Sequence, residues 1–436
     1  MVETMNDISL DKAIVGLDIG TSKVVCIIAA PDTDLQYLNI LGIGIAESKG
    51  LRRGVVTNID KTVESIRQAV ERAEQQSGVK VVDVVVGIAG DHIQSFATRN
   101  IITIPSPTKE ISARDVERLI DESRKINISS DRRILHVIPQ EYVIDGQDGI
   151  TDPIGMSGVR MEANVHVVTA LVTAIQNIQR CVERAGLRMR DIVLEPLASS
   201  NSVLDADEKE IGVAVIDIGA GTTDIAVFCE NIIRYSAVFG IGGQHVTDDI
   251  AKVLGILHSQ AEKIKRDYGH AIQTNILNDE VIQIPGVSGR NPMEITKGLL
   301  AEIIQPRLEE IFEFAYAEIK NSGYANRLSA GIVLTGGCSL LRGAAELAQD
   351  VFGMPVKIGI PTEIAHGGFA REVENPIFAT SVGLVLHGVR YRSAAGYQQT
   401  PFQNEEVDTT QDKEIQQDTG ITSRIVGSVK RFFNEL

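Results

Sequence analysis

Apolar residues along the chain follow two spacings. Continuous or alternating apolar runs predict β-strands, and they occur at residues 13–25, 37–45, 81–88 and 212–225. Apolar residues three and four positions apart predict helices, and they occur at residues 60–76, 173–186 and 377–390. Because strands alternate with helices over most of the chain, we expect an α/β fold.

The segments at 13–25 and 212–225 share one pattern. Each has an apolar run, then Asp-Ile-Gly, then small residues with hydroxyl groups, then a second apolar run. Either copy alone is typical of an ordinary hairpin in which Gly and Asp only form the turn. Two copies with the same flanks favour a pair of facing hairpins. Their polar and glycine positions are Asp18, Gly20, Thr21, Ser22 and Lys23 in the first copy, and Asp217, Gly219, Gly221, Thr222 and Thr223 in the second.

These residue types suit a phosphate site. Glycine lets the backbone approach a ligand closely, and backbone amides together with Thr and Ser hydroxyls donate hydrogen bonds to phosphate oxygens. An aspartate at the end of a strand, such as Asp18 or Asp217, can hold Mg2+, usually through water. The two hairpins therefore predict a clamp for the phosphate chain of one nucleotide and its metal ion.

Two further segments extend this predicted site. An apolar strand at 330–335 ends in Gly336-Gly337 before a helical run at 340–352. A helix N-terminus that follows two glycines offers an electropositive binding position for a phosphate or sugar. A helix at 259–268 places Glu262, Lys265 and Arg266 on one face. Taken alone, that face is typical of a solvated, salt-bridged surface. The neighbouring glycine motifs make it a candidate ligand contact.

Composition excludes several other classes of protein. The 436 residues carry a formal net charge of −16, which argues against general nucleic-acid binding, since phosphate backbones need clustered Lys and Arg. The four cysteines lie apart in apolar runs, so we expect reduced core thiols and no disulfide or zinc site. The N-terminus has no apolar segment typical of a signal peptide, and no apolar run is long enough to span a bilayer. We therefore expect a protein made and kept in the cytoplasm.

Residues 90–166 have a different organisation from the segments before and after them. A helix at 112–125, with Ser112 and Asp115 as a capping pair, is followed by strands at 133–144 and 159–168 that flank a glycine-rich loop. This periodicity favours a small inserted subdomain. The alternative interpretation is a long decorated loop.

The C-terminal part of the chain predicts a linker and an anchor. Residues 393–420 are rich in Gln, Thr, Asp and Glu, which is typical of a disordered acidic linker. At 100° per residue, the terminal sixteen residues, 421–436, form an amphipathic basic helix, which favours an interfacial membrane anchor over packing onto the protein's own body. Its apolar arc contains Ile421, Ile425, Val426, Val429, Phe432, Phe433 and Leu436, and its cations are Arg424, Lys430 and Arg431.

With both hairpins, the Glu195-Pro196 turn and the Gly336-Gly337 turn in place, the chain resembles the actin, heat-shock chaperone and sugar kinase ATPase superfamily. The segments 133–142 and 155–161 and the terminal helix resemble the FtsA family of bacterial cell-division proteins within it. The resemblance implies a two-lobed actin-like α/β fold with ATP and Mg2+ in its cleft. The implied parts are 13–89, 167–208 and 377–392 in the first lobe, 90–166 as the insert, 209–248 and 325–376 in the second-lobe core, 249–324 as its outer subdomain, 393–420 as linker and 421–436 as membrane-targeting helix.

The resemblance also implies roles for individual residues. The two Asp-Ile-Gly segments correspond to the first and second phosphate motifs, with Asp18 and Asp217 on the metal and Asp217 also a catalytic candidate. Gly336 and Gly337 resemble the adenosine motif, and Glu262 and Lys265 the pair that contacts purine and ribose. Glu195 lies where chaperone relatives keep a carboxylate near the hydrolytic water, and we expect at most a weak ATPase.

The implied partners are those of cell division. Arg307 and Glu310 match the polar contacts for the C-terminal peptide of the tubulin-like protein FtsZ. An actin-like filament of the chain with itself, an anionic membrane surface and later division proteins complete the expected partners. The alternatives are a sugar or acid kinase of the superfamily, which would not need a basic amphipathic tail, and a pilus-assembly scaffold, which should lack the linker and tail. A chaperone would need a β-rich substrate domain after the ATPase body.

Overall fold

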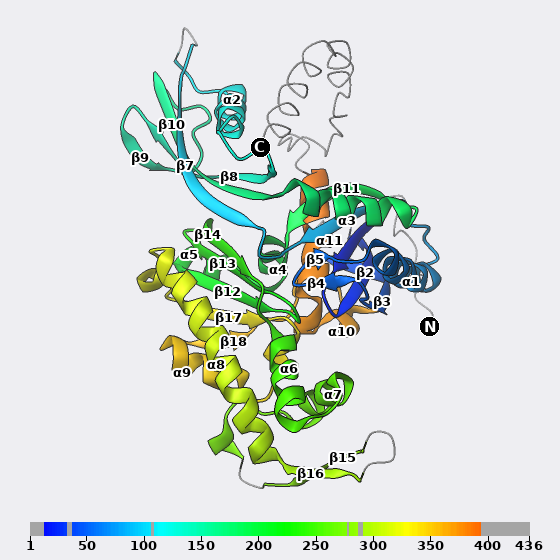
Figure 1. Cartoon of the computed structure of the whole chain (residues 1–436). Coiled ribbons are helices and arrows are strands. Elements are labelled where there is room, and N and C mark those ends of the chain that lie inside the picture. Colours follow the sequence, from blue (N-terminus) through cyan, green and yellow to red (C-terminus); the bar gives the residue numbers. More distant parts are fainter. Residues whose placement is uncertain (1–12, 33–36, 106–108, 277–278, 287–290, 394–436) are drawn as a thin grey trace, which may run out of the picture. The chain divides into compact units, whose positions relative to one another are not determined.

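The computed structural model describes residues 13–393, apart from 33–36, 106–108, 277–278 and 287–290 (Figure 1). The predicted membrane-targeting helix at 421–436 and the predicted linker from residue 394 onward lie outside the described residues. The described residues form strands and helices in alternation, which confirms the predicted α/β fold.

The first lobe is built on a five-stranded sheet in the order β11-β6-β1-β2-β3. Strand β1 is antiparallel to β2 and parallel to β6, and all six of its residues are buried. A strand covered on both faces is expected to be a continuous apolar run, which explains the sequence pattern at this position. The strands are β1 (Ile14–Ile19), β2 (Lys23–Pro31), β3 (Leu38–Glu47), β6 (Asp83–Ile88) and β11 (Arg188–Leu194).

The second lobe repeats this topology. Its sheet has the order β14-β13-β12-β17-β18, with β12 antiparallel to β13 and parallel to β17. Asp18 and Asp217 occupy equivalent positions, each in the next-to-last register pair of its hairpin. The repeated sequence pattern therefore reflects a repeated structural unit. The strands are β12 (Val213–Ile218), β13 (Thr223–Cys229), β14 (Ile232–Phe239), β17 (Gly331–Thr335) and β18 (Val356–Ile358).

Helices cover both sheets and follow local signals in the sequence. The Asn58 side chain accepts a hydrogen bond from the Lys61 amide at the start of α1, and Gly78 ends that helix in the left-handed conformation. The helices are α1 (Ile59–Ser77), α3 (Val172–Arg184), α4 (Glu195–Val203), α5 (Ala206–Ile211), α6 (Gly243–Leu254), α7 (His258–Tyr268), α8 (Lys297–Asn321), α9 (Ala344–Phe352), α10 (Ala370–Val373) and α11 (Ala379–Ser393).

Helix α11 returns to the first lobe, where it lies against the strands of the N-terminal segment (Figure 1). A Cβ atom on Gly383 would lie 1.8 Å from the Ala198 carbonyl oxygen, and one on Gly16 would lie 2.8 Å from the Ser381 carbonyl oxygen. Only glycine allows these backbones to approach so closely. The start of α11 is thereby held beside both β1 and α4.

The segment after β6 has its own sheet and its own buried cluster, so it is a subdomain and the loop interpretation is wrong. Ser112 and Asp115 form the predicted capping box. The sequence pattern missed two strands, β7 and β9, because most of their residues are exposed or half-buried and polar. The subdomain contains β7 (Gln94–Thr103), α2 (Ala113–Arg124), β8 (Arg132–Ile144), β9 (Gln147–Ile150) and β10 (Arg160–Leu171).

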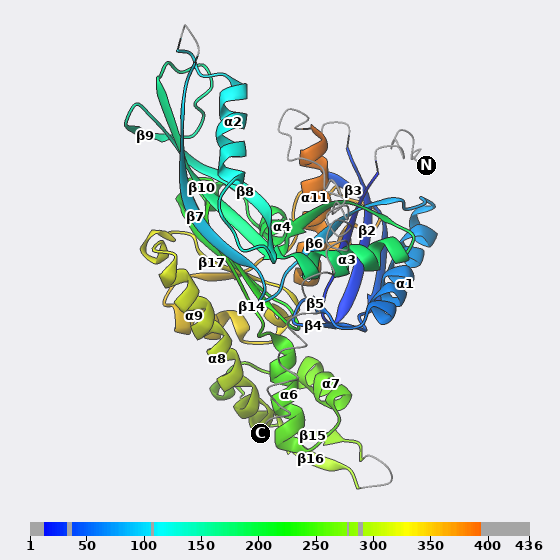
Figure 2. The same ribbon diagram turned by 45° about the horizontal axis from the view of Figure 1, so that its top comes forward.

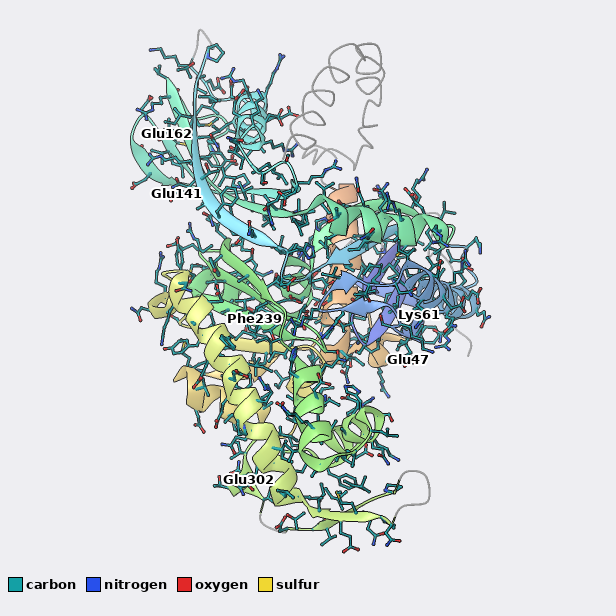
Figure 3. The ribbon with its side chains drawn as sticks, in the orientation of Figure 1. Glu47, Lys61, Glu141, Glu162, Phe239 and Glu302 are labelled. Atoms are coloured by element: carbon teal, nitrogen blue, oxygen red, sulfur yellow. The ribbon has the colours of Figure 1, made fainter. Side chains whose placement is uncertain are left out.

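Side chains of this subdomain bond to the second lobe. Gln140 Nε2 donates to the Ile233 carbonyl oxygen over 2.6 Å, and His166 Nε2 lies 2.9 Å from Ser236 Oγ, both on the edge strand β14. Glu162 on β10, labelled in Figure 3, is almost fully buried and is paired with an arginine on each side. The subdomain is therefore connected to the first lobe through the polypeptide chain, and side-chain hydrogen bonds hold it to the second lobe.

Other boundaries differ from the sequence-based expectation. The helix expected at 340–352 begins only at Ala344, and a 3-10 turn at Gly337–Leu340 precedes it. Helix α8 begins at Lys297, directly after residues 293–296, which pair with 281–284 as a hairpin of β15 (Val281–Ile284) and β16 (Met293–Thr296). A further short hairpin, β4 (Leu51–Arg52) with β5 (Val55–Val56), precedes α1.

Candidate functional site

The two Asp-Ile-Gly hairpins form the same turn and touch each other. The Gly20 amide donates to the Lys23 carbonyl over 3.0 Å, and the Gly219 amide donates to the Thr222 carbonyl over the same distance. Gly221 is buried against the other hairpin: a Cβ atom on it would lie 2.4 Å from Thr21 Oγ1. The two predicted phosphate motifs, far apart in the sequence, therefore face each other across the lobes.

Four carboxyl groups converge behind these turns. Burial is the main cause that raises the pKa of each of them, and repulsion by neighbouring carboxylates adds to the shift of Asp217, Asp224 and Glu195. The pKa of Asp217 is raised to about 6. The four are Asp18 at the end of β1, Asp217 at the end of β12, Asp224 on β13 and Glu195 at the start of α4.

Asp224 is the member of this cluster that the sequence analysis did not select. It pairs with Asp217 in the β12–β13 register, and only 3% of its surface is exposed. Its Oδ1 is buried and makes no hydrogen bond to any described residue. The sequence feature that could have identified Asp224 is its position directly before the apolar run Ile225-Ala226-Val227. An orphaned carboxylate oxygen in an acidic cluster is a position that a cation or its water ligands would satisfy.

One lysine faces the cluster from the first hairpin. The Lys23 ammonium bonds to the Ile377 carbonyl and lies 5.0 Å from the centroid of the Phe378 ring. Burial lowers its pKa, and the negative charges of Asp18 and Asp217 oppose that shift. Among the described residues, four carboxyl groups thus face the one ammonium group of Lys23, and their oxygen atoms fit a divalent cation such as Mg2+.

The described residues hold no group of three or more His, Cys, Asp or Glu side chains close enough to bind a metal ion directly. The expectation from the sequence was contact between Mg2+ and Asp18 or Asp217 through water, which does not require such a group.

The hydroxyl groups of the two hairpins differ in availability. Ser22 is exposed, and Thr21 Oγ1 accepts a bond from the Gly54 amide over 3.3 Å. Thr222 bonds to the Asp224 carboxylate, while Thr223 Oγ1 donates to the Ile241 carbonyl over 2.8 Å and is fully buried. The Thr223 hydroxyl group is therefore not available to a ligand in this structure.

The predicted adenosine motif lies against the same cluster. Gly336 has a φ of +81°, and a Cβ atom there would lie 2.2 Å from Asp217 Oδ1, so only glycine fits. The Gly243 amide, at the start of α6, donates to the Gly219 carbonyl over 2.9 Å. A Cβ atom on Gly243 would also lie 3.4 Å from Cys338 Sγ. The first turn of α6 therefore joins the second hairpin to the segment after Gly336.

Glu262 and Lys265 are brought to this region by α7. Their side chains form an ion pair of 2.7 Å, and Lys265 Nζ also donates to the Gly243 carbonyl over 2.9 Å and to Thr247 Oγ1 over 2.8 Å. The pair is thus assembled beside the start of α6, with the Lys265 side chain 13% and the Glu262 side chain 39% exposed.

Arg307 and Glu310 lie elsewhere, on α8. Arg307 Nε donates to Asp249 Oδ2 on α6 over 2.6 Å, and its Nη1 bonds to Glu310 one turn later. The side chains of Arg307 and Glu310 are 28% and 42% exposed, so both remain accessible to a partner. This pair forms a second candidate site, separate from the carboxyl cluster.

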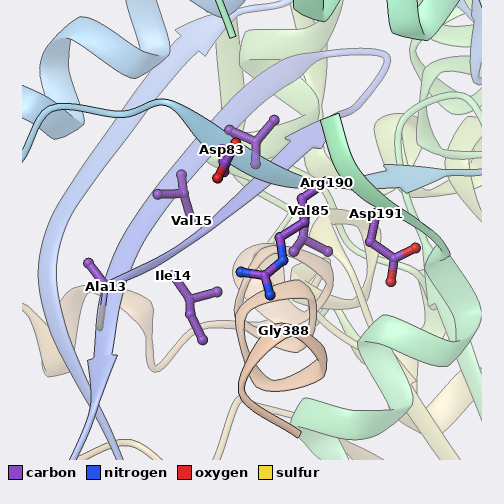
Figure 4. A pocket seen from close by; sticks show the side chains of 9 residues that line it. Ala13, Ile14, Val15, Asp83, Val85, Arg190, Asp191 and Gly388 are labelled. Carbon is purple, nitrogen blue, oxygen red and sulfur yellow. The ribbon is translucent and has the colours of Figure 1, made fainter. Parts of the chain in front are cut away.

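Figure 4 shows a cavity of about 30 Å³ at the opposite end of β1 from Asp18. It is bordered by Ile14, Val85, Arg190 and Gly388 among others. This volume is enough for a water molecule but not for a nucleotide, so the cavity is not the predicted ligand site. Within the described part of the chain, no helix combines the length and hydropathy needed to cross a bilayer.

Two family models match the chain. One, described as "Cell division protein FtsA", matches residues 214–383, and another, "SHS2 domain inserted in FTSA", matches residues 90–169. The cell division protein FtsA of Pseudomonas aeruginosa is 47% identical over 389 residues, which cover 89% of this chain and 92% of that protein. FtsA of Escherichia coli K12 is 38% identical over 384 residues, covering 86% and 90%.

Solved structures share the fold at low identity. The "PilM-PilN type IV pilus biogenesis complex" has a TM-score of 0.63 at 18% identity and covers 86% of this chain and 98% of its own. MreB5 of Spiroplasma citri bound to ADP has a TM-score of 0.54 at 16% identity, covering 89% and 100%. The MamK double helical filament has a TM-score of 0.50 at 13% identity, covering 87% and 98%. These similarities confirm the two-lobed actin-like fold.

The curated relatives decide between the functions that the sequence left open. Sequence identity of 38% to 47% over most of the chain joins it to cell-division proteins. The inserted subdomain, which bonds to the second lobe through β14, is the part matched by the FtsA-specific insert. The chain therefore belongs to the FtsA family and is an actin-like bacterial cell-division protein.

Proposed function

We propose that this cell-division protein binds Mg2+-ATP between its two phosphate hairpins and links FtsZ to the cytoplasmic face of the membrane at the division site. The observation that carries the nucleotide proposal is the acidic cluster behind two touching hairpins, in which Asp224 Oδ1 lacks a hydrogen bond to any described residue. The MreB5 relative of the same fold is bound to ADP, which supports a nucleotide at the corresponding place.

Each group of residues has a proposed part in holding the nucleotide. The backbone amides of Thr21 and Ser22 would bind phosphate oxygens from one side, and those of Gly221 and Thr222 from the other. Gly20 and Gly219, whose amides close the two turns, and the buried Thr223 would shape the clamp. Lys23 would balance part of the acidic charge. Gly336, Gly337 and the Glu262–Lys265 pair would contact the adenosine.

The acidic residues would serve the metal and the water. Asp18 and Asp217 would hold Mg2+ through water, and Mg2+ would supply positive charge to the phosphate oxygens. Glu195, whose pKa is raised by burial and by its acidic neighbours, could orient a water molecule near the phosphates. The proposed ATPase activity is low at most.

The partner sites are proposed on separate surfaces. An acidic FtsZ tail peptide would bind along α8 at Arg307 and Glu310, and exposed apolar side chains lie nearby, with Val253 one turn after Asp249 and Phe314 two turns after Arg307. The Phe239 ring, labelled in Figure 3, lies near the Phe314 ring, with the two ring centroids 6.2 Å apart.

The amphipathic 421–436 segment would bind anionic lipid. Actin-like filaments of the chain would place many such segments side by side and would recruit later division proteins.

The nucleotide proposal is tested by calorimetric titration of Mg2+-ATP into the full-length protein and into Asp217→Asn. We expect the variant to bind at least roughly tenfold more weakly, since it loses a charged contact to the metal. Asp148→Asn, an exposed aspartate on β9, is the matched control and should bind like the wild type. Equal affinity of wild type and Asp217→Asn would refute the role of Asp217, and no binding by the wild type would refute the proposed function.

A further inference from the structure

The β4–β5 hairpin has an arginine where its turn does not favour one. Its two turn residues, Arg53 and Gly54, have φ values of +50° and +76°. A two-residue turn with both φ values positive favours Asn, Asp or Gly at its first position, because other side chains clash with the backbone there. The equivalent turn between β8 and β9 uses Asp145 and Gly146, in agreement with that preference. The turn between β13 and β14 has Glu230 and Asn231 at φ values of +59° and +61°, and there the unfavourable Glu230 forms ion pairs with Arg234 and Arg327. An unfavourable residue retained in such a conformation suggests a functional side chain.

The turn is fixed against the first phosphate hairpin. The Gly54 amide donates to Thr21 Oγ1 over 3.3 Å, and a Cβ atom on Gly54 would lie 2.5 Å from the Ala89 carbonyl oxygen. A Cβ atom on Gly90 would lie 3.2 Å from the Arg53 carbonyl oxygen. The backbone of Arg53 is therefore held between the first hairpin and the end of β6.

The side chain of Arg53 crosses to the other lobe. A Cβ atom on Gly240, directly after β14, would lie 3.1 Å from Arg53 Cδ. The chain continues from Gly240 to Gly243, whose amide bonds to the second phosphate hairpin at Gly219. Figure 2 shows the β4–β5 hairpin between the first-lobe strands and the second-lobe elements at this point. The aliphatic part of the Arg53 side chain therefore contacts the second lobe at Gly240, shortly before the segment that bonds to the second phosphate hairpin.

The charge balance of the site calls for another cation. Lys23 faces the acidic cluster and bonds to the Ile377 carbonyl, so its charge is directed toward carboxylates. Arg53 is exposed, and its guanidinium group makes no hydrogen bond or ion pair to any described residue. The Asp91 carboxylate lies beside the same Gly240, with Oδ2 3.5 Å from a Cβ atom placed there. A guanidinium group presents several N–H donors in one plane and matches the oxygens of a phosphate group.

We propose that Arg53 binds the phosphate chain of the nucleotide and, through its stem on Gly240, links phosphate binding to the approach of the two lobes. This inference rests on the proposed nucleotide site. It adds to that site a residue from outside both glycine hairpins. It also gives a reason for an arginine at a turn position where asparagine would be more stable.

The test compares two adjacent arginines in the full-length protein. Arg53→Asn and Arg52→Asn remove the same charge from the same hairpin, and asparagine suits the left-handed conformation at position 53. Binding of a fluorescent ATP analogue with Mg2+ is measured for both, together with Tm without nucleotide. We expect Arg53→Asn to weaken binding roughly tenfold or more with an unchanged or higher Tm, and Arg52→Asn to bind like the wild type.

Each other outcome would overturn the assignment. Equal affinity of Arg53→Asn and wild type would remove Arg53 from the site, and an equal loss in Arg52→Asn would reduce the effect to the general charge of the hairpin. If Arg53→Asn lowers Tm, Arg53→Gly, which also tolerates the turn, takes its place, and affinity like that of the wild type then refutes the proposal. These results differ from failure of the nucleotide site itself, in which the wild-type protein would not bind the analogue.

Discussion

The Thr380 hydroxyl, on the first turn of α11, donates a hydrogen bond of 3.0 Å to Asp217 Oδ2, although 163 residues separate the two in sequence. The next residue, Ser381, donates over 3.4 Å to Asp18 Oδ2. Two consecutive hydroxyl groups on one helix thus bond to the equivalent aspartates of the two repeated hairpins. Helix α11 therefore joins the lobes at the acidic cluster.

Thr380→Val should raise the pKa of Asp217 above its value of about 6, because it removes a donor that favours the ionised carboxylate. Mg2+-ATP affinity should then fall near pH 6.5, by up to about tenfold for a bond to a charged group, and should recover as the pH rises. The measurement is the dissociation constant between pH 6 and 8.5. Ser381→Ala, which removes the longer bond to Asp18, should have the smaller effect. A pH profile of Thr380→Val that overlays the wild type would contradict this link.

The acidic cluster should make the nucleotide-free protein less stable as the pH rises. The folded pKa of Asp217, about 6, lies above its ordinary value of 3.8, so the folded state binds more protons than the unfolded state between these values. The contribution of this group is present at low pH and is lost as the pH rises through 6. Each pKa unit corresponds to about 1.4 kcal/mol.

Asp217→Asn should therefore raise the Tm of the nucleotide-free protein at pH 7.5 and reduce the fall in Tm between pH 5.5 and 7.5. Thermal unfolding followed by circular dichroism without Mg2+ checks this. Asp148→Asn, an exposed residue, should leave the profile unchanged. A lower Tm for Asp217→Asn at pH 7.5 would show that the ionised carboxylate stabilises the fold.

Arg307→Glu should weaken binding of an acidic FtsZ tail peptide roughly ten- to a hundredfold, because it removes a charge-assisted contact worth about 1.5–3 kcal/mol and places a negative charge beside Asp249 and Glu310. Fluorescence anisotropy with a labelled peptide measures the effect. Lys263→Glu, an exposed residue on α7 with the same change of charge, is the control and should bind normally. An unchanged dissociation constant for Arg307→Glu would place the peptide site elsewhere.

Removal of residues 421–436, or Phe432→Glu, should abolish attachment to anionic liposomes, since the apolar arc and the cations Arg424, Lys430 and Arg431 would provide the binding energy. Attachment of the wild type should rise steeply with protein concentration, because assembly multiplies weak single contacts. Co-sedimentation across a concentration series tests both statements. A truncated protein that still sediments with liposomes would contradict the first, and binding independent of assembly would contradict the second.

The sequence by itself determined the repeated units of this protein. Continuous apolar runs specified β1 and β12, since both faces of these strands are covered. Local signals specified helix ends such as Gly78 and the Ser112–Asp115 capping box, because caps depend on residues within one turn. The glycines of the two hairpins were also evident, as each turn needs only its own residues. The polar strand β7 was missed, because its weak apolar pattern does not show the burial that its neighbours create.

Only the tertiary structure decided which of these residues share a site. It placed Asp224 beside Asp217 and the Thr380 hydroxyl within hydrogen-bond distance of Asp217. It also placed the Arg53 side chain against Gly240 and showed that the Thr223 hydroxyl donates to the Ile241 carbonyl. No spacing in the sequence reports these contacts, since they join segments whose separation is set by how two sheets and a returning helix pack. Periodicity and turn chemistry are local, whereas pKa shifts and hydrogen-bond partners depend on burial and on distant neighbours.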